Sequence, residues 1–236
     1  MSKKFAFTND NDNRVVVDPS LTKKSNKIAK KMIDAAKAHD KQVTNDLLNI
    51  TKGTAATISY DQKDDEGIVR NSLTYRIKTQ DSLSDKLRKD SKYDESKLES
   101  TAKEVYDVLR YTALVDDPDM LVKSFHSIKL NLEQQGYTMM RCRNTLDTYN
   151  NENPYRGINT VIQTKDRYNF ELQFHTTESL RIKEKNHALY KQVSDKNSDK
   201  QNQKLLDEMY KNSKAMKNIK NSSSISSFDK FKKGGK

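Results

Sequence analysis

The sequence predicts an α+β domain in which helices flank a mixed, mostly antiparallel sheet of about five strands. Apolar and charged residues each make up 33% of the 236 residues, so the chain supplies one compact core and long polar surfaces. Segments 69–77 and 169–175 alternate apolar and polar residues, which is the period of a strand. Segments 21–50 and 118–135 repeat apolar residues every three or four positions, which is the period of an amphipathic helix. Helices and strands interleaved in this order are typical of an α+β fold.

The remaining elements follow from the same two periods and from turn residues. Long helices are expected near both ends of the chain, and the ends themselves are rich in polar residues. Helices are expected at 21–50, from Asp81 and Ser82 onward, at 118–135, at 178–192 and at 196–217. Strands are expected at 57–60, 69–77, 105–115 and 137–143, and on either side of a turn at 164–167.

The domain organisation follows from composition. Residues 1–20 are expected to be disordered, 21–195 to form one domain with its core at 68–192, 196–217 to form a C-terminal helix, and 218–236 to be a basic flexible tail. The net charge is +11, and residues 212–236 carry +6 of it. Such a tail is either merely solubilising or attracts RNA, DNA or another anionic surface.

Several classes of protein are disfavoured. No apolar run approaches the roughly 18 residues of a membrane span, and the N-terminus turns polar too early for a signal peptide. Cys142 is the only cysteine, which is compatible with a reducing compartment, and we expect a cytoplasmic location. Zinc is not expected, because the chain has no CxxC or HExxH spacing.

Two stretches carry candidate site residues. On segment 169–175, Glu171, Gln173 and His175 share the face opposite Phe170, Leu172 and Phe174, although an ordinary half-exposed strand would show the same pattern. Four basic or hydroxyl side chains surround the start of the helix after 79 and could cradle phosphate, or could simply form a solvated face. They are Arg76, Lys78, Ser82 and Lys86.

A third stretch, 105–115, reads as an apolar strand that contains Asp107 and Arg110. Charged side chains are costly when buried unpaired, so each needs a partner or a metal ion. A mutual ion pair between the two is the simpler explanation.

These stretches coincide with the motifs of one family. Residues 76–86 reproduce R-x-K-x(3)-S-[IL]-x(2)-K at every spacing, and Asp107 with Arg110 resembles the acidic second motif. Residues 154–160 are similar to G-Y-x-[SG]-[IL]-H-T with Asn159 in place of His, and 171–176 are similar to E-x-Q-[IF]-R-T with His175 in place of Arg. Over about 69–192 the chain therefore resembles the RelA/SpoT synthetase-type nucleotidyltransferases, the (p)ppGpp synthetases of the stringent response and their toxin relatives, in a divergent form typical of toxins and mobile elements.

The resemblance implies a nucleotidyltransferase-like fold and transfer of pyrophosphate from ATP to a ribose 3′-hydroxyl. It implies that Asp107 and Glu171 hold Mg²⁺ and that Glu171 takes the proton from the attacking hydroxyl. The resemblance assigns the ATP triphosphate to a first set of residues, namely Arg76, Lys78, Ser82, Lys86 and Arg110. It assigns the acceptor to a second set, in which Tyr155 stacks on the base, namely Tyr155, Asn159, Gln173, His175, Arg156, Arg141 and Arg143.

Several alternatives remain open at this point. The acceptor is GDP or GTP, an adenine nucleotide, or the 3′ end of a tRNA, which the basic tail would tolerate. The chain is otherwise a catalytically inactive nucleotide-binding protein, or a nucleic-acid-associated protein of a mobile element. An antitoxin or a second copy of the chain is a further conceivable partner, and a membrane is not.

Overall fold

The computed structural model describes residues 18–63, 67–146, 154–193 and 197–234, which divide into two compact units. The first unit includes residues up to Met32 and Thr79–Val105, and the second includes Ile33–Lys78 and Tyr106–Lys236. Each unit is described by itself. Residues 1–17, most of the segment predicted to be disordered, lie outside the described residues. In the described residues, no helix is long and apolar enough to span a membrane.

The first unit is helical. It contains the start of α1 (Pro19–Ile50), α2 (Gln80–Asp90), the 3₁₀ turn η2 (Glu95–Lys97) and α3 (Leu98–Ala102). Thr79 caps α2, because its hydroxyl accepts the backbone N–H of Ser82 at 3.3 Å. Leu83, Leu87 and Leu98 are fully buried, so these short helices are stabilised by packing rather than by their length.

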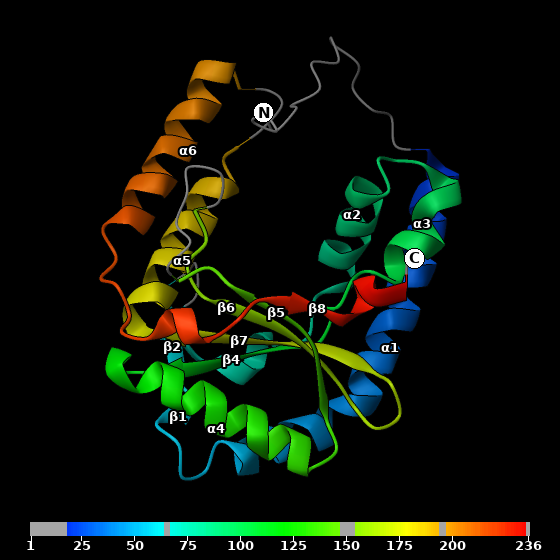
Figure 1. Ribbon diagram of the computed structural model, residues 1–236. Helices are drawn as coiled ribbons and strands as arrows, with labels where there is room; N and C mark the ends of the chain where they lie inside the picture. The colour runs from blue at the N-terminus through cyan, green and yellow to red at the C-terminus, as the bar shows by residue number, and fades with distance from the viewer. Residues whose placement is uncertain (1–17, 64–66, 147–153, 194–196, 235–236) are drawn as a thin grey trace. The chain divides into compact units, whose positions relative to one another are not determined.

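The second unit is organised around a six-stranded sheet of order β1-β4-β7-β6-β5-β8 (Figure 1). Among the described strands, β4 and β7 pair in parallel and every other neighbouring pair is antiparallel. The strands are β1 (Ala56–Thr57), β4 (Arg110–Val115), β5 (Thr138–Asn144), β6 (Ile158–Gln163), β7 (Asn169–Thr176) and β8 (Phe228–Asp229). A separate hairpin pairs β2 (Asp61–Lys63) with β3 (Val69–Asn71). This sheet confirms the predicted fold class.

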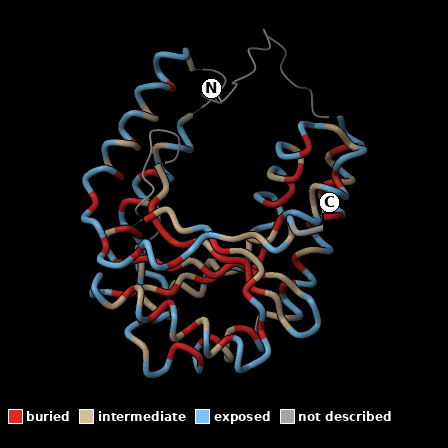
Figure 2. The backbone as a smooth tube through the Cα atoms, viewed as in Figure 1, coloured by how far each residue is buried: buried red, intermediate tan, exposed pale blue. Residues whose placement is uncertain are grey.

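Helices cover both faces of the sheet (Figure 1). They are the second part of α1, α4 (Leu121–Gln134) after the 3₁₀ turn η3 (Pro118–Met120), and α5 (Thr177–Tyr190), while α6 (Asp199–Lys214) packs against α5. The Phe125 ring of α4 meets the Phe174 ring of β7 edge-on at 5.0 Å, and Phe170 contacts Tyr111 and Tyr137 in the same way. The alternation of β7 therefore directs its phenylalanines to the α4 face, where the buried positions concentrate (Figure 2). Glu171 and Gln173 face the opposite side.

Two strand predictions are only partly right. The predicted strand 69–77 ends at Asn71, where the Asn71 side chain accepts the N–H of Leu73 and starts a 3₁₀ turn (η1, Ser72–Tyr75). This capping competes with the sheet ladder, as is common for asparagine. The predicted strand 105–115 begins only at Arg110, although Ile77 forms an isolated antiparallel bridge with Leu109.

The C-terminal segment differs from the expected flexible tail. Residues 222–234 form the 3₁₀ turns η4 (Ser222–Ser224) and η5 (Lys230–Gly234) with β8 between them, and β8 pairs with β5. The Asn144 amide donates to the carbonyls of Ser222 and Ile225 at 2.7 and 3.0 Å. Ile225 is buried and the Phe231 ring stacks on Tyr106 at 4.8 Å, so a few apolar residues hold this lysine-rich segment on the sheet.

Candidate functional site

The four motif segments that lie in the second unit are neighbours in space. Arg110 N donates to the Arg76 carbonyl at 2.8 Å and Lys78 N to the Val108 carbonyl at 3.0 Å, so segment 76–78 pairs with 108–110. Strand β4 then pairs with β7, and β7 with β6. Segments 76–78, 107–110, 171–176 and 158–160 therefore occupy consecutive positions across one sheet.

The strand register fixes which side chains share a face. Residues directly opposite one another in neighbouring strands point to the same side of a sheet. Two rows on one face result: the first runs Arg141, Val161, Glu171, Arg110 and is polar except at Val161, and the second runs Arg143, Asn159, Gln173, Thr112. Glu171 thus lies in the middle of the sheet, with an arginine to each side along its row.

Glu171 is 8% exposed, and amide groups occupy both of its oxygens. Asn159 Nδ2 donates to Oε2 at 2.7 Å, and Gln173 Nε2 donates to Oε1. The asparagine that replaces the family's histidine therefore orients the carboxylate. Its own Oδ1 is buried and has no hydrogen-bond partner among the described residues, so it could accept a hydrogen bond from a ligand.

Asp107 forms its ion pair with Lys78 and not with Arg110. The Lys78 Nζ lies 3.2 Å from Asp107 Oδ2, and the simpler explanation offered for Asp107 and Arg110 is wrong in its choice of partner. The other oxygen, Oδ1, is buried and has no hydrogen-bond partner among the described residues. An orphaned carboxylate oxygen fits a divalent cation, because Mg²⁺ prefers such oxygens. No group of three or more described His, Cys, Asp or Glu residues surrounds it, so phosphate and water oxygens would complete the coordination.

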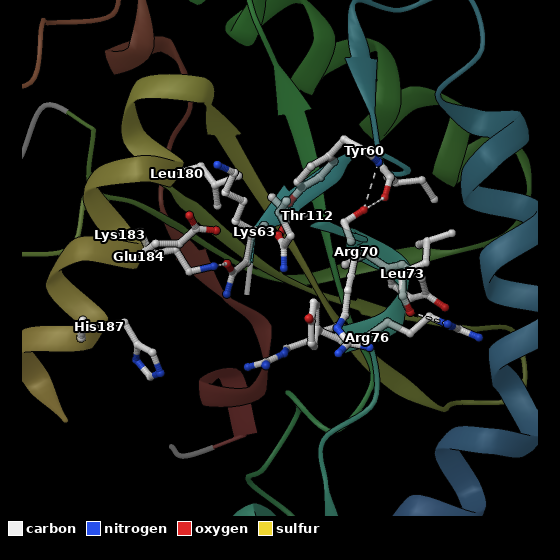
Figure 3. A pocket seen from close by; sticks show the side chains of 18 residues that line it. Tyr60, Lys63, Arg70, Leu73, Arg76, Thr112, Leu180, Lys183, Glu184 and His187 are labelled. Carbon is white, nitrogen blue, oxygen red and sulfur yellow. Dashed lines mark hydrogen bonds between the residues drawn. The ribbon is translucent and has the colours of Figure 1, made fainter. Parts of the chain in front are cut away.

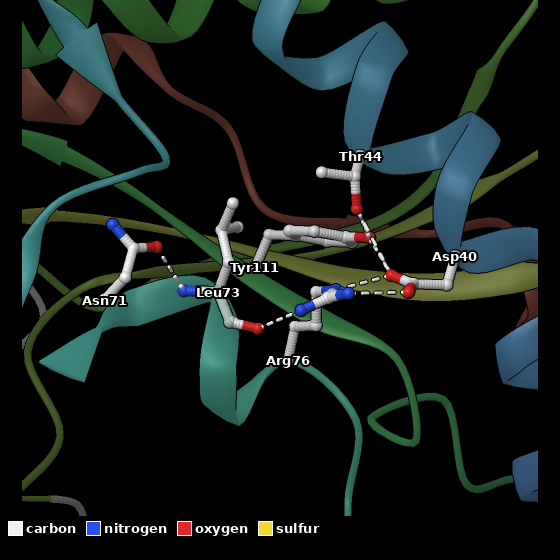
Figure 4. Close-up of polar contacts among 6 residues, drawn as sticks. All are labelled: Asp40, Thr44, Asn71, Leu73, Arg76 and Tyr111. Atoms are coloured by element: carbon white, nitrogen blue, oxygen red, sulfur yellow. Dashed lines mark hydrogen bonds and ion pairs between the residues drawn. The ribbon is translucent and has the colours of Figure 1, made fainter.

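Arg76 is held in place by the protein itself (Figure 4). Its Nε and Nη2 donate to Asp40 Oδ1 and Oδ2 at 2.5 and 2.7 Å, and its Nη1 donates to the Leu73 carbonyl. Thr44 and Tyr111 also donate to Asp40 Oδ1, at 3.2 and 3.3 Å. The Arg76 guanidinium keeps the pKa of Asp40 below its ordinary value, because a charge-assisted bond favours the ionised carboxylate.

His175, which the resemblance assigns to the acceptor, is enclosed by the protein. The ring is fully buried, with Nε2 2.9 Å from the Tyr155 hydroxyl and Nδ1 2.9 Å from Ser179 Oγ. Burial, and to a lesser degree the Lys183 charge, hold the His175 pKa well below its ordinary value, so the imidazole is neutral. The Tyr155 and His175 rings meet edge-on at 5.5 Å. His175 therefore fixes the position of the Tyr155 side chain.

Arg156, which the resemblance also assigns to the acceptor, is bound within the protein. It is 5% exposed, and its guanidinium donates to the carbonyls of Leu146, Ser213 and Met216. Two of these acceptors, the carbonyls of Ser213 and Met216, lie at the end of α6. The Arg156 charge therefore stabilises this helix end. The other two arginines of this set differ from it. Arg143 is exposed, and the Arg141 guanidinium lies 5.3 Å above the Tyr106 ring with its Nε unbonded among the described groups.

Two predicted ATP-binding residues belong to the first unit. Ser82 is exposed in the first turn of α2, and Lys86 forms an ion pair with Asp90 one turn further on at 3.3 Å. Each is described within that unit only. Their role in binding ATP stays a prediction.

A cavity of about 560 Å³ opens on the polar face of the sheet (Figure 3). Arg76, Arg110 and Gln173 line it, as the resemblance leads one to expect. The sequence analysis did not find most of its other lining residues, because they come from the β2–β3 hairpin and from α5, outside the motifs. Those that bear on binding are Tyr60, Lys63, Arg70, Lys183, Glu184 and His187. The volume is in the range of small-ligand sites, and the excess of cations indicates an anionic ligand.

The structure thus combines a mostly antiparallel sheet, an acidic residue on a central strand, arginines along its row and a cationic cavity beside it. A solved structure has a similar fold at low sequence identity. The small alarmone synthetase 2 from Bacillus subtilis matches with 12% identity and a TM-score of 0.50, over 78% of this chain and 90% of that chain. The chain therefore has the fold of a small alarmone synthetase, and the resemblance to RelA/SpoT-type synthetases is confirmed for the fold.

Two further structures match less closely. The small alarmone synthetase 1 from Bacillus subtilis, bound to its product pppGpp, has 14% identity and a TM-score of 0.46, over 79% of this chain and 86% of that chain. The complex of the Type VI effector Tas1 with its immunity protein has 16% identity and a TM-score of 0.46, over 79% and 94%. Both TM-scores are below 0.5, so the fold assignment rests on the first structure. No family model and no curated protein matches the sequence.

Proposed function

We propose that this chain is a pyrophosphokinase, which transfers the pyrophosphate group of ATP to the 3′-hydroxyl of an acceptor nucleotide. One observation carries the proposal: the motif segments 76–78, 107–110, 158–160 and 171–176 lie side by side across the sheet with Glu171 at their centre. A cavity lined by Arg76 and Arg110 adjoins them. Reactions of this type need positioning and charge neutralisation more than covalent catalysis.

In this reaction the acceptor oxygen attacks the β-phosphorus of ATP, the bond between that phosphorus and the α,β-bridging oxygen breaks, and AMP leaves. Glu171 accepts the proton of the attacking hydroxyl, while Asn159 and Gln173 orient its carboxylate. Asp107 and Glu171 would hold Mg²⁺, which neutralises phosphate charge when bound. Tyr155 stacks on the acceptor base, and Arg141 and Arg143 bind the acceptor phosphates.

The direct test uses radiolabelled ATP and a panel of acceptors, namely GDP, GTP, AMP, ADP, ATP and tRNA, with the products resolved by chromatography. Glu171→Gln preserves the size of the side chain and removes the carboxylate, so labelled product should fall by at least about 100-fold. Glu133→Gln, an exposed glutamate on α4, is the matched control and should leave the rate unchanged. Equal product from wild type and Glu171→Gln would exclude the proposed role of Glu171.

The proposal extends to a cytoplasmic toxin. Expression in a bacterial host should then arrest growth, Glu171→Gln should abolish the arrest, and a neutralising partner protein should relieve it. The acceptor that is labelled in the panel decides between a nucleotide and tRNA. Normal growth under expression of soluble, labelling-competent protein would remove the toxin role without affecting the chemistry.

One observation favours a second function, a nucleotide-binding protein without turnover. Lys78 and Asp107 form an ion pair with each other. The lysine that would bind ATP and the carboxylate that would bind Mg²⁺ are therefore both engaged. In that case calorimetry would show ATP binding, while AMP would never be released with any acceptor. Release of AMP that depends on an acceptor would exclude this second function.

A further inference from the structure

Lys183 on α5 lies outside all four motifs, yet it contacts the residues at the centre of the site. Its Nζ donates to Gln173 Oε1 at 2.7 Å, and Gln173 Nε2 donates in turn to Glu171 Oε1. An ammonium group can only donate, so the Gln173 carbonyl oxygen must face Lys183. The NH₂ end of the same amide then necessarily faces Glu171. Lys183 and the acceptor-only carboxylate of Glu171 therefore act together to fix which way the Gln173 amide points.

The ammonium group of Lys183 has N–H donors that Gln173 does not use. Of its three N–H groups, one is used by Gln173, and the remaining two have no hydrogen-bond acceptor among the described residues. Lys183 is half-buried and lines the 560 Å³ cavity (Figure 3). Donors in this position can bind a ligand that enters the cavity.

The surroundings of Lys183 favour an anion. Arg110 and Lys63 line the same cavity from β4 and the β2–β3 hairpin, with Glu184 as the one acidic residue among the described residues that line it, and clustered cations favour an anionic ligand. Burial is the main reason that the pKa of Lys183 falls to about 8; Glu171 and Glu184 oppose this shift and Arg110 adds to it, and an anion bound beside the ammonium group would favour its charged form.

We propose that Lys183 has two roles in this site: one N–H holds the Gln173 amide against Glu171, and the other two bind a phosphate group of an anionic ligand. The proposal rests on the proposed function for the role of Glu171. Lys183 is a positioning residue toward Glu171 and a binding residue toward phosphate. The chemical class of the ligand is a polyphosphate, either free or carried by a nucleotide.

The first test needs no catalytic activity and uses inorganic triphosphate and ATP as probes. Lys183→Met removes the ammonium group at similar length, Lys183→Arg retains a charged donor, and Lys185→Met is the matched control on an exposed turn of the same helix. Calorimetry should show at least 10-fold weaker binding for Lys183→Met, binding within about 3-fold of wild type for Lys183→Arg, and no change for Lys185→Met. Unchanged binding by Lys183→Met would overturn the phosphate role.

The positioning role has a separate readout, the side-chain amide signal of Gln173 in a ¹⁵N–¹H spectrum, assigned by its loss in Gln173→Met. This signal should shift in Lys183→Met and stay near its wild-type position in Lys183→Arg and Lys185→Met. An unchanged Gln173 signal in Lys183→Met would overturn the positioning role.

If wild type releases AMP, Lys183→Met should also lower kcat by about 10- to 100-fold, the usual loss for a residue that orients a reacting group. If wild type releases no AMP with any acceptor, the proposed function fails, while the binding and amide measurements still decide the inference. Weakened triphosphate binding with a shifted Gln173 signal would then establish Lys183 as part of a polyphosphate site without turnover.

Discussion

Replacing Asp40 by alanine should destabilise the second unit considerably, because it leaves Arg76 half-buried without its anion. The pair is bidentate, with N–O distances of 2.5 and 2.7 Å, and the side chains of Arg76 and Asp40 are 30% and 16% exposed. A hydrogen bond to a charged group contributes about 1.5–3 kcal/mol to stability, and partial exposure to solvent reduces this value. Thr44 and Tyr111 lose an acceptor as well.

For Asp40→Ala we therefore expect a loss of about 2–3 kcal/mol in the free energy of unfolding, or a Tm lower by about 4–10 °C for a chain of this size. Urea unfolding and differential scanning calorimetry measure the two quantities. A double-mutant cycle with Arg76→Ala should give a coupling of about 1–2 kcal/mol. The control is Asp166→Ala, which breaks an exposed pair with His39 and should cost about 0–1 kcal/mol. If Asp40→Ala costs no more than Asp166→Ala, Arg76 is not held by this pair and is available to bind phosphate.

Three further predictions concern the buried network and the C-terminal segment. Gly157→Ala should cost about 1–3 kcal/mol in the free energy of unfolding, because a Cβ there would lie 2.5 Å from His175 Cε1 and 2.9 Å from the Tyr155 hydroxyl oxygen. Thermal unfolding measures this cost, and an unchanged Tm would show that the two rings can move aside. Below pH 6.5 the unfolded chain protonates His175 while the folded chain resists it, so stability should fall by up to about 1.4 kcal/mol per pH unit. Urea titrations between pH 7 and pH 5 should show a smaller slope for His175→Gln. Truncation after residue 217 should lower the Tm measurably, since it removes β8, the buried Ile219 and Ile225, and the Phe231–Tyr106 stack, whereas a flexible tail would be removed without effect.

Much of the fold is predictable because it depends on local periodicity. The alternation along β7 is strong enough to predict which residues face α4 and which face the site, and Phe174 and Glu171 lie accordingly. The end of β3 at Asn71 was missed, since a capping side chain overrode an alternating pattern. The sparse apolar residues of 218–234 gave too weak a signal for packing, because Ile225 and Phe231 act through contacts with Asn144 and Tyr106 that are distant in sequence.

The candidate site was predictable where it follows motifs and not where it depends on long-range pairing. The motif positions of Glu171, Asp107 and Arg76 lie on neighbouring segments as the resemblance implies. The partners of these side chains were not visible in the sequence: Asp40 for Arg76, Lys78 for Asp107, and Lys183 by way of Gln173. The resemblance assigns His175 and Arg156 to the acceptor, and no pattern in the sequence indicates that each is buried with hydrogen-bond partners of its own.

The parallel pairing of β4 with β7 has a consequence for when the candidate site is completed during synthesis. Parallel neighbours require a crossover, and here α4, β5 and β6 intervene between the two strands. A nascent chain that has emerged only as far as β6 already carries the arginine and aspartate motifs, yet it lacks Glu171, the central residue of the candidate site. Contacts over such long sequence separations form late in folding. Ribosome-bound fragments that end before β7 should therefore lack an assembled site, and under the proposed function any activity would be delayed until β7 has been made.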